Sequence, residues 1–430
     1  MGSGGGGRRR MSGQGAGQGR RRAGRLVVFL RDAAWLSAER AQAYVRVLAV
    51  MLAIVAVGWV ALSRDGVTVA GFPLGSDFVS FWAASGLALD GRPAAAYDPA
   101  AHYAVQRIAV PATDESYYAF LYPPVFLLAC LPLAALPYLW SLTLWLGITG
   151  LAYWRCLRAL LPQRWAALPI LAYPAVLMNA GHGQNGFLST ACFGAVMLAL
   201  DRRPVLAGMA FGGLVFKPHL AVVVPVALAA AGRWRTLIAA ALSASALCLL
   251  SWLVFGTAVW RGFLAQTALA RAVLEQDLVG PAKMVSPFAA VRLLGGGVGT
   301  AYAAQIAVGL ALCGLLWGIR RARPCGLDLG ALMAAMAALA SPFLLDYDLV
   351  LLALPMAWLM ASAQRTGFRP WEKTVLFAVF VAPLVIRTVS LQLEVPLGPP
   401  VLAALLFVVA SRALSPCEPN QSSASCASPC

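Results

Sequence analysis

The chain has 430 residues, of which 60% are hydrophobic and 12% are charged, and its formal net charge is +16. Long apolar runs recur between Tyr44 and Arg412, which excludes a soluble globular protein and predicts an all-α polytopic membrane protein, because the runs are too long for barrel strands. The positive charge falls in short clusters beside those runs, so we interpret it as a signal of cytoplasmic orientation and of attraction to anionic lipid, with no nucleic-acid partner.

The first 43 residues predict a basic tail on the cytoplasmic side of the membrane. Eight arginines fall within the first 31 residues, and residues 1–25 are rich in Gly, Arg and Ser, a composition typical of disorder. Residues 20–42 fit a basic amphipathic helix lying on the membrane surface. The apolar run 44–62 is long enough to span a bilayer, so we do not expect a cleavable signal peptide.

With that tail inside, residues 63–121 are expected to form a first extracytoplasmic loop. This loop holds six of the seventeen acidic residues of the chain. Residues 77–88 and 99–110 have helical spacing with moderate amphipathicity. They predict two short helices lying along the membrane surface, joined by a turn at 93–99.

The transmembrane domain is expected to cover residues 44–411 with 10 to 13 helices. After the first helix, apolar runs predict spans at about 122–154, 165–180, 184–200, 204–231, 235–256, 299–319, 327–341, 343–361, 372–393 and 396–411. The first of these runs fits either one crossing or two short helices broken near Pro132 and Pro137, and another reads as two half-length helices interrupted at Lys217. A second extracytoplasmic loop is expected at 257–298, and a disordered tail at 412–430.

Asp77 is the most informative residue of the chain. It follows the first apolar run and is flanked by Phe78, Phe81 and Trp82. Acidic groups near hydrocarbon are costly and usually lie in polar cavities, where a carboxylate with restricted access to water can act as a general base on a hydroxyl. Asp77 also fits an N-cap of the helix expected to begin at Phe78, because Asp is favoured at that position.

A polar segment at 179–186 separates two apolar runs. Non-helical backbone at membrane depth is tolerated only where it is buried in protein or lines a cavity. The side chains of His182, Gln184 and Asn185 therefore suit hydrogen bonds to sugar hydroxyls. An ordinary interhelical turn with helix caps is the alternative.

Two further apolar regions carry charged residues. Lys217, close to His219, requires an anion or a polar cavity, and a phosphate is a natural partner for it; alternatively it snorkels from the end of a short helix. Asp346 and Asp348 are expected to contact a substrate or to pair with Arg387, the isolated arginine of the next run. A plain surface loop would explain them as well.

Taken in order, these segments resemble glycosyltransferase family 87, the polyprenol-phosphate-mannose-dependent mannosyltransferases of the GT-C superfamily. The pieces that carry the resemblance are Ser-Asp-Phe…Phe-Trp-Ala-Ala (76–84), Gly-Arg-Pro…Tyr-Asp (91–98), Tyr-Pro-Pro…Leu-Pro-Leu…Leu-Pro-Tyr (122–138), Gly-Gln-Asn (183–185), Ala-Gly…Lys-Pro-His (207–219) and Ser-Pro (341–342). Asp346-Tyr347-Asp348 follows that Ser-Pro, where relatives often carry a histidine-containing segment.

The resemblance implies a GT-C-type bundle in which Asp77 deprotonates an acceptor hydroxyl. That hydroxyl would attack the anomeric carbon of a sugar, mannose by default, carried on polyprenyl phosphate, with inversion. The candidate donor-phosphate or substrate-binding residues are Lys217, His219, Gln184, Asn185, His182, Tyr122, Asp346, Asp348 and Arg387. The implied partners are the bilayer, the lipid-linked donor and a glycan or glycolipid acceptor. We expect a multi-pass protein of the plasma (inner) membrane with its active site facing the extracytoplasmic side.

A transporter or flippase for a lipid-linked or small solute is the alternative function, and a non-catalytic partner in a cell-envelope assembly is a third. A transporter would favour inverted repeats, and we find no internal repeat. No cofactor or metal is expected, because the nine cysteines form no CxxC pair and the chain has only three histidines.

Overall fold

The computed structural model describes residues 25–111 and 116–415, and every regular element within them is a helix. The predicted all-α class is therefore confirmed. Five of these helices are long and apolar enough to cross a membrane: Ala38–Ala61, Trp234–Glu275, Val298–Ala322, Asp346–Thr366 and Glu372–Leu393. Seven shorter apolar helices accompany them, so the chain is a multi-pass membrane protein, and the number of crossings stays a prediction.

Proline begins many of the short helices, since its fixed φ suits the first helical turn and its missing N–H is not needed there. In chain order the helices are α2 (Ala38–Ala61), α3 (Phe78–Leu89), η1 (Pro93–Tyr97), α4 (Pro99–Ala109), α5 (Pro124–Cys130), η2 (Leu133–Ala135), α6 (Tyr138–Leu160), η3 (Arg164–Ala166), α7 (Ala167–Leu171), α8 (Pro174–His182), α9 (Gly186–Ala199), α10 (Pro204–Gly213), η4 (Leu214–Phe216), α11 (Pro218–Ala221), α12 (Val223–Ala230), α13 (Trp234–Glu275), η5 (Pro281–Lys283), α14 (Pro287–Leu293), α15 (Val298–Ala322), α16 (Gly326–Ala340), η6 (Asp346–Leu352), α17 (Ala353–Thr366), α18 (Glu372–Leu393) and α19 (Gly398–Ala413).

Helix α16 is almost entirely buried and packs against α9, α17 and α19, so it lies at the centre of the bundle. Around them, α10 packs closely on α13 through Gly208 and Gly212, four residues apart on one face. A Cβ at Gly208 would overlap the carbonyl oxygen of Thr236, and one at Gly212 would lie 2.7 Å from that of Ala240. Small residues at this spacing let two membrane helices approach closely.

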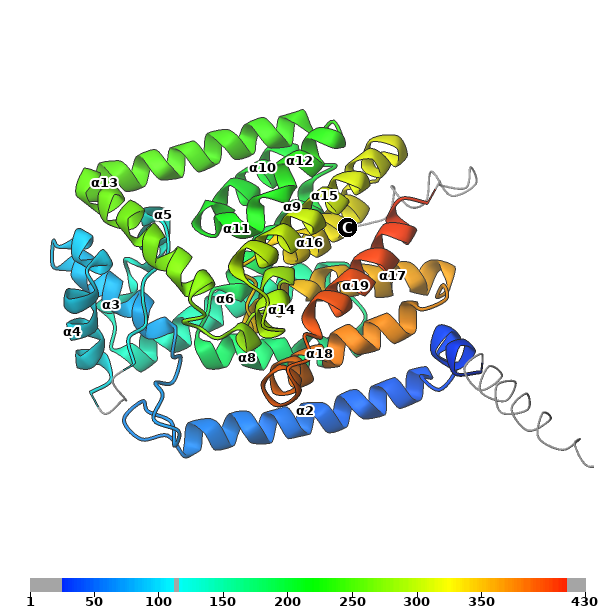
Figure 1. Ribbon diagram of the computed structural model, residues 1–430, viewed down its shortest axis with the longest axis horizontal. Coiled ribbons are helices and arrows are strands. Elements are labelled where there is room, and N and C mark those ends of the chain that lie inside the picture. The colour runs from blue at the N-terminus through cyan, green and yellow to red at the C-terminus, as the bar shows by residue number, and fades with distance from the viewer. Residues whose placement is uncertain (1–24, 112–115, 416–430) are drawn as a thin grey trace, which may run out of the picture.

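The bundle has two distinct ends, separated by the length of α2 (Figure 1). Helices α3 and α4 lie at one end, beyond the C-terminus of α2, and we call this the Asp77 end. At the other end, residues 25–32 meet the connection between α17 and α18, and we call this the basic end because Arg31, Arg369 and Lys373 gather there. A helix of 24 residues puts about 36 Å between the two ends.

The two long apolar runs for which the sequence indicated a break, 122–154 and 204–231, are both interrupted in the structure. Helix α5 ends at Cys130 and α6 begins at Tyr138, so the run 122–154 is broken around Pro132 and Pro137. Helix α10 gives way to η4, and α11 begins immediately after Lys217. Proline and the buried charge of Lys217 together account for the second interruption.

One expectation for the loops was wrong. Residues 20–42 do not form one helix, because residues 33–37 interrupt it and Ser37 caps α2. The helices expected at 77–88 and 99–110 are α3 and α4, and most residues of α3 are buried within the protein. Helix α13 bends at Gly256 (φ 80°), where the expected span 235–256 ends, and a second helical stretch continues into the expected second loop, with α5 and η1 beside α13. The predicted disorder of residues 1–24 and 416–430 lies outside the described residues, but its start at 412 was wrong, because Arg412 and Ala413 are buried in the last turn of α19.

Candidate active site

The polar break between α8 and α9 packs directly against the segment that carries Asp77. Helix α8 ends at His182, and Gly183 takes a left-handed conformation (φ 64°). A Cβ at Gly183 would lie 2.5 Å from the Cβ of Phe78 and 3.2 Å from the Cα of Gly75, so only glycine allows this approach. The backbone N–H of Asp77 donates to the carbonyl of His182 at 3.0 Å, which fixes the two segments together.

The carboxylate of Asp77 points away from its own helix. It makes no capping hydrogen bond to α3, so the N-cap interpretation was wrong for the side chain. Its Oδ2 accepts a hydrogen bond from Nε2 of Gln184 at 2.9 Å, and its Oδ1 lies 3.8 Å from Nδ1 of His182. The Asp77 side chain is 25% exposed, so one oxygen is held by the protein while the group can still be reached from outside.

Gln184 is the centre of a hydrogen-bond network that orients this carboxylate. Its Nε2 also approaches the hydroxyl of Tyr347 at 3.2 Å, and its Oε1 accepts from the hydroxyl of Tyr122 at 3.1 Å and from the backbone N–H of Asn185 at 2.9 Å. Because Oε1 accepts from two donors, the amide orientation that places Nε2 on Asp77 is fixed. Sequence reasoning did not single out Tyr347; its position between two acidic residues is the only signal that could have indicated it.

Lys217 is buried and paired within the protein. Its Nζ donates to Oδ1 of Asp348 at 2.5 Å and to Oδ1 of Asn185 at 2.9 Å. The Lys217 and Asp348 side chains are 4% and 1% exposed, so the snorkelling interpretation was wrong. The ammonium also lies 5.6 Å from the ring centroid of Tyr347, a cation–π distance. The pair therefore supports the residues that hold Asp77.

Asp346 and Arg387 are paired, as one of the sequence interpretations predicted. Nη1 of Arg387 lies 3.6 Å from Oδ2 of Asp346. Asp346 is buried, which contradicts a plain surface loop at this position, whereas the Arg387 side chain is 40% exposed. His219 has a different partner, since its Nδ1 lies 2.8 Å from the hydroxyl of Ser341. The structure does not give His219 a contact with Asp77 among the described residues.

A buried histidine fastens α4 to α3, the helix that follows Asp77. Nε2 of His102 donates to the carbonyl of Ser80 at 3.0 Å, which leaves Nδ1 as an acceptor for Gln106 at 3.1 Å and for the hydroxyl of Tyr117 at 3.3 Å. Burial lowers the pKa of His102 to about 4, although the bond to Ser80 acts in the opposite direction. The imidazole is therefore neutral at pH 7.

The family model for glycosyltransferase family 87 matches residues 120–342, just over half of the chain. The chain belongs to glycosyltransferase family 87. It is accordingly a membrane glycosyltransferase, and the family membership favours this function over a transporter. No curated protein and no solved structure matches the chain.

The matched range contains only part of the site. Tyr122, the polar break and Lys217 lie within it, whereas Asp77 and Arg387 lie outside it. The network of hydrogen bonds therefore joins residues of the family region to a carboxylate that precedes it. Within the described residues, no group of three or more His, Cys, Asp or Glu side chains is arranged to hold a metal ion.

Proposed function

We propose that this glycosyltransferase transfers mannose from a polyprenyl-phosphate donor to a glycan or glycolipid acceptor, with inversion and with Asp77 as the general base. The observation that carries the proposal is the Asp77 carboxylate itself. It is partly exposed, is oriented through Gln184, has no lysine or arginine partner among the described residues, and does not cap its helix. A base of this kind needs a fixed direction and an accessible oxygen.

The proposed reaction is a single displacement at the anomeric carbon of the donor sugar. The acceptor hydroxyl gives its proton to Asp77 as its oxygen forms a bond to the anomeric carbon of the sugar. The bond between that carbon and the phosphate oxygen breaks, and polyprenyl phosphate leaves with the electron pair. Because the acceptor oxygen attacks the face opposite the leaving phosphate, the configuration at the anomeric carbon inverts. A lipid phosphate is an activated leaving group, so no nucleotide-binding domain is required.

The leaving phosphate needs a cation, and we assign that role to Arg387 instead of Lys217. Lys217 is almost fully buried and already paired with Asp348, whereas Arg387 is 40% exposed. The contact of Arg387 with Asp346, at 3.6 Å, is also longer than a hydrogen bond. An exposed guanidinium can form two parallel hydrogen bonds to a phosphate and stabilise charge as the bond breaks.

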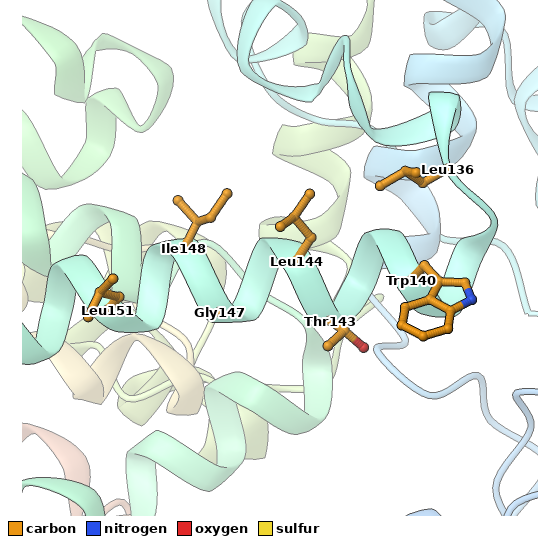
Figure 2. A pocket seen from close by; sticks show the side chains of 7 residues that line it. All are labelled: Leu136, Trp140, Thr143, Leu144, Gly147, Ile148 and Leu151. Atoms are coloured by element: carbon orange, nitrogen blue, oxygen red, sulfur yellow. The ribbon is translucent and has the colours of Figure 1, made fainter.

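An apolar groove on α6 supports a lipid-linked donor. The groove has a volume of about 450 Å³ and begins at Leu136, whose carbonyl accepts a hydrogen bond from Nε1 of Trp82 at the Asp77 end. Figure 2 shows Trp140, Leu144 and Ile148 projecting from the same helix along it. The opposite face of α6 contacts the polar break through Trp145, whose Nε1 donates to the carbonyl of Gly183. A polyprenyl chain in this groove would keep its phosphate near the site.

The distribution of charge supports an orientation of the protein in the membrane. Arg31, Arg369 and Lys373 lie at the basic end, and basic residues beside spanning helices mark the cytoplasmic face. Asp77 lies at the other end of the bundle (Figure 1). This arrangement supports an extracytoplasmic active site in the plasma (inner) membrane.

The test is transfer of radiolabelled mannose from polyprenyl phosphate to envelope glycolipid by the purified full-length protein. Asp77→Asn keeps the hydrogen-bonding shape but removes the base, so we expect turnover to fall by about 10²–10⁴-fold with donor binding retained. Asp90→Asn, at an exposed position of the same loop, is the matched control and keeps wild-type turnover. Full turnover in Asp77→Asn would refute the general-base assignment.

A further inference from the structure

A second charged pocket lies at the basic end of the bundle, remote from Asp77. It has a volume of about 330 Å³ and is lined by Arg31, Asp32, Phe368, Arg369, Pro370 and Lys373. Three cations thus face one carboxylate. The proposed sugar transfer makes no use of this pocket, because α2 separates it from the Asp77 end (Figure 1).

The walls of this pocket are held in place by the surrounding structure. Arg412 donates to both oxygens of Glu372 at 2.7 Å, and Oε2 of Glu372 also accepts from the backbone N–H of Arg369 at 2.8 Å. The backbone N–H of Trp371 donates to the carbonyl of Arg31 at 2.7 Å. The connection before α18 and the segment 25–32 are therefore fixed against each other, so the backbone that carries the three cations is in place before any ligand binds.

The charges of the pocket are not fully neutralised by the protein. Nε of Arg31 pairs with Asp32 at 3.0 Å, and Nη1 of Arg369 donates to Ser411 and Ser415. Lys373 forms no ion pair or hydrogen bond within the described part of the chain, and its Nζ lies over the ring of Phe368 at 5.4 Å. The pocket therefore keeps an excess of positive charge and suits an anion.

The position of the pocket identifies the source of that anion. Helix α18 is a candidate membrane span that begins at Glu372, so Lys373 lies in its first turn, at the membrane surface. Beside it, the helical residues 25–32 expose Leu26, Val27, Val28 and Phe29 by 50–58%. Apolar side chains next to a basic pocket at the end of a span match the boundary between acyl chains and headgroups.

We propose that this pocket binds the phosphate of an anionic phospholipid headgroup, with the acyl chains of that lipid lying against the exposed apolar residues of the segment 25–32. A free phosphate would satisfy the three cations, but it would leave those apolar side chains uncovered. The pocket is thus a lipid site of the membrane leaflet at the basic end.

The experiment is native mass spectrometry of the full-length protein in neutral detergent, titrated with dioleoylphosphatidylglycerol, dioleoylphosphatidylcholine or inorganic phosphate. The pocket variant is Arg31→Gln/Lys373→Gln, which leaves Arg369 to support the chain near Ser411. The control is Arg320→Gln/Arg321→Gln, which removes two exposed cations from the end of α15. Each cation near the membrane surface is expected to contribute about fivefold to binding.

We expect the wild type and the control to bind phosphatidylglycerol at least tenfold more tightly than phosphatidylcholine, and the pocket variant to bind it about 25-fold more weakly than the wild type. The single variant Lys373→Gln should lose about fivefold, which keeps the test available if the double variant does not fold. Equal losses in pocket variant and control would show diffuse surface charge and overturn the proposal. Competition by an equal concentration of inorganic phosphate would overturn the lipid source.

Discussion

The buried pair of Lys217 and Asp348 makes the sharpest prediction about stability. Lys217→Met removes the ammonium and leaves the Asp348 carboxylate buried with only the backbone N–H of Leu345 near its Oδ2. Asp348→Leu leaves the ammonium with Asn185 alone. Removing one partner of a buried ion pair costs about 3–5 kcal/mol, so each single variant should lose that much stability.

The double variant should recover most of the loss. Replacing both charges by apolar groups of similar size removes the unpaired charge. The remaining loss of stability is about 1–2 kcal/mol, because Oδ1 of Asn185 no longer has the hydrogen-bond donor that Lys217 provides. The three variants therefore have a coupling free energy of several kcal/mol. We would measure unfolding in mixed detergent and SDS micelles by tryptophan fluorescence.

Two results would refute this reasoning. If the single losses simply add in the double variant, the two side chains do not interact as the structure has them. If Lys217→Met is as stable as the wild type, the ammonium of Lys217 does not stabilise the fold. Donor affinity provides a separate readout, because a lysine that binds the donor phosphate would leave the double variant stable but unable to bind donor.

Three further predictions concern the residues around Asp77. Because burial lowers the pKa of His102 to about 4 from an ordinary 6.5, its neutral form stabilises the fold above pH 6.5, and about 3 kcal/mol is lost as pH falls to 4. The hydrogen-exchange protection factors of α3 and α4, corrected for the pH dependence of intrinsic amide exchange, should fall over that range, and His102→Asn should remove this pH dependence. Gly183→Ala should abolish transfer, because the added Cβ overlaps Phe78 at a positive φ, whereas Gly181→Ala, which meets nothing within 4 Å, should remain active; equal activities would contradict the packing. Arg387→Gln should lower kcat/KM for the lipid donor about tenfold or more with the protein still folded, and an unchanged kcat/KM would remove Arg387 from the phosphate site.

The sequence predicted the helical class and the elements that frame the site, because apolar length and proline position are local signals. The breaks near Pro132 and at Lys217 could be read directly from such signals. The expected span 235–256 ends where α13 bends, at the non-helical Gly256, whereas the helical stretch that follows this glycine was expected only as part of a loop. The burial of α3 could not be predicted from local signals, because it comes from helices that are distant in the sequence.

The residues of the candidate site were easier to predict from the sequence than the contacts between them. Asp77 and Gln184 are 107 positions apart, and Lys217 and Asp348 are 131 apart. Each pair could be proposed from the cost of isolated charge near hydrocarbon, but the choice of partner depends on packing. From the sequence we therefore expected Lys217 to bind a phosphate, whereas in the structure its partner is the carboxylate of Asp348.

The contacts of Lys217 with Asp348 and Asn185 indicate what its buried charge does for the site. Asn185 accepts from Lys217, and the backbone N–H of Asn185 donates to Oε1 of Gln184, whose Nε2 holds Asp77. The amide of Gln184 could otherwise rotate and present its oxygen to the carboxylate, which would repel it. Lys217 and Asp348 thus help to fix the direction of Asp77 from two residues away, and in the proposed mechanism a base held in this way would begin each turnover already aligned.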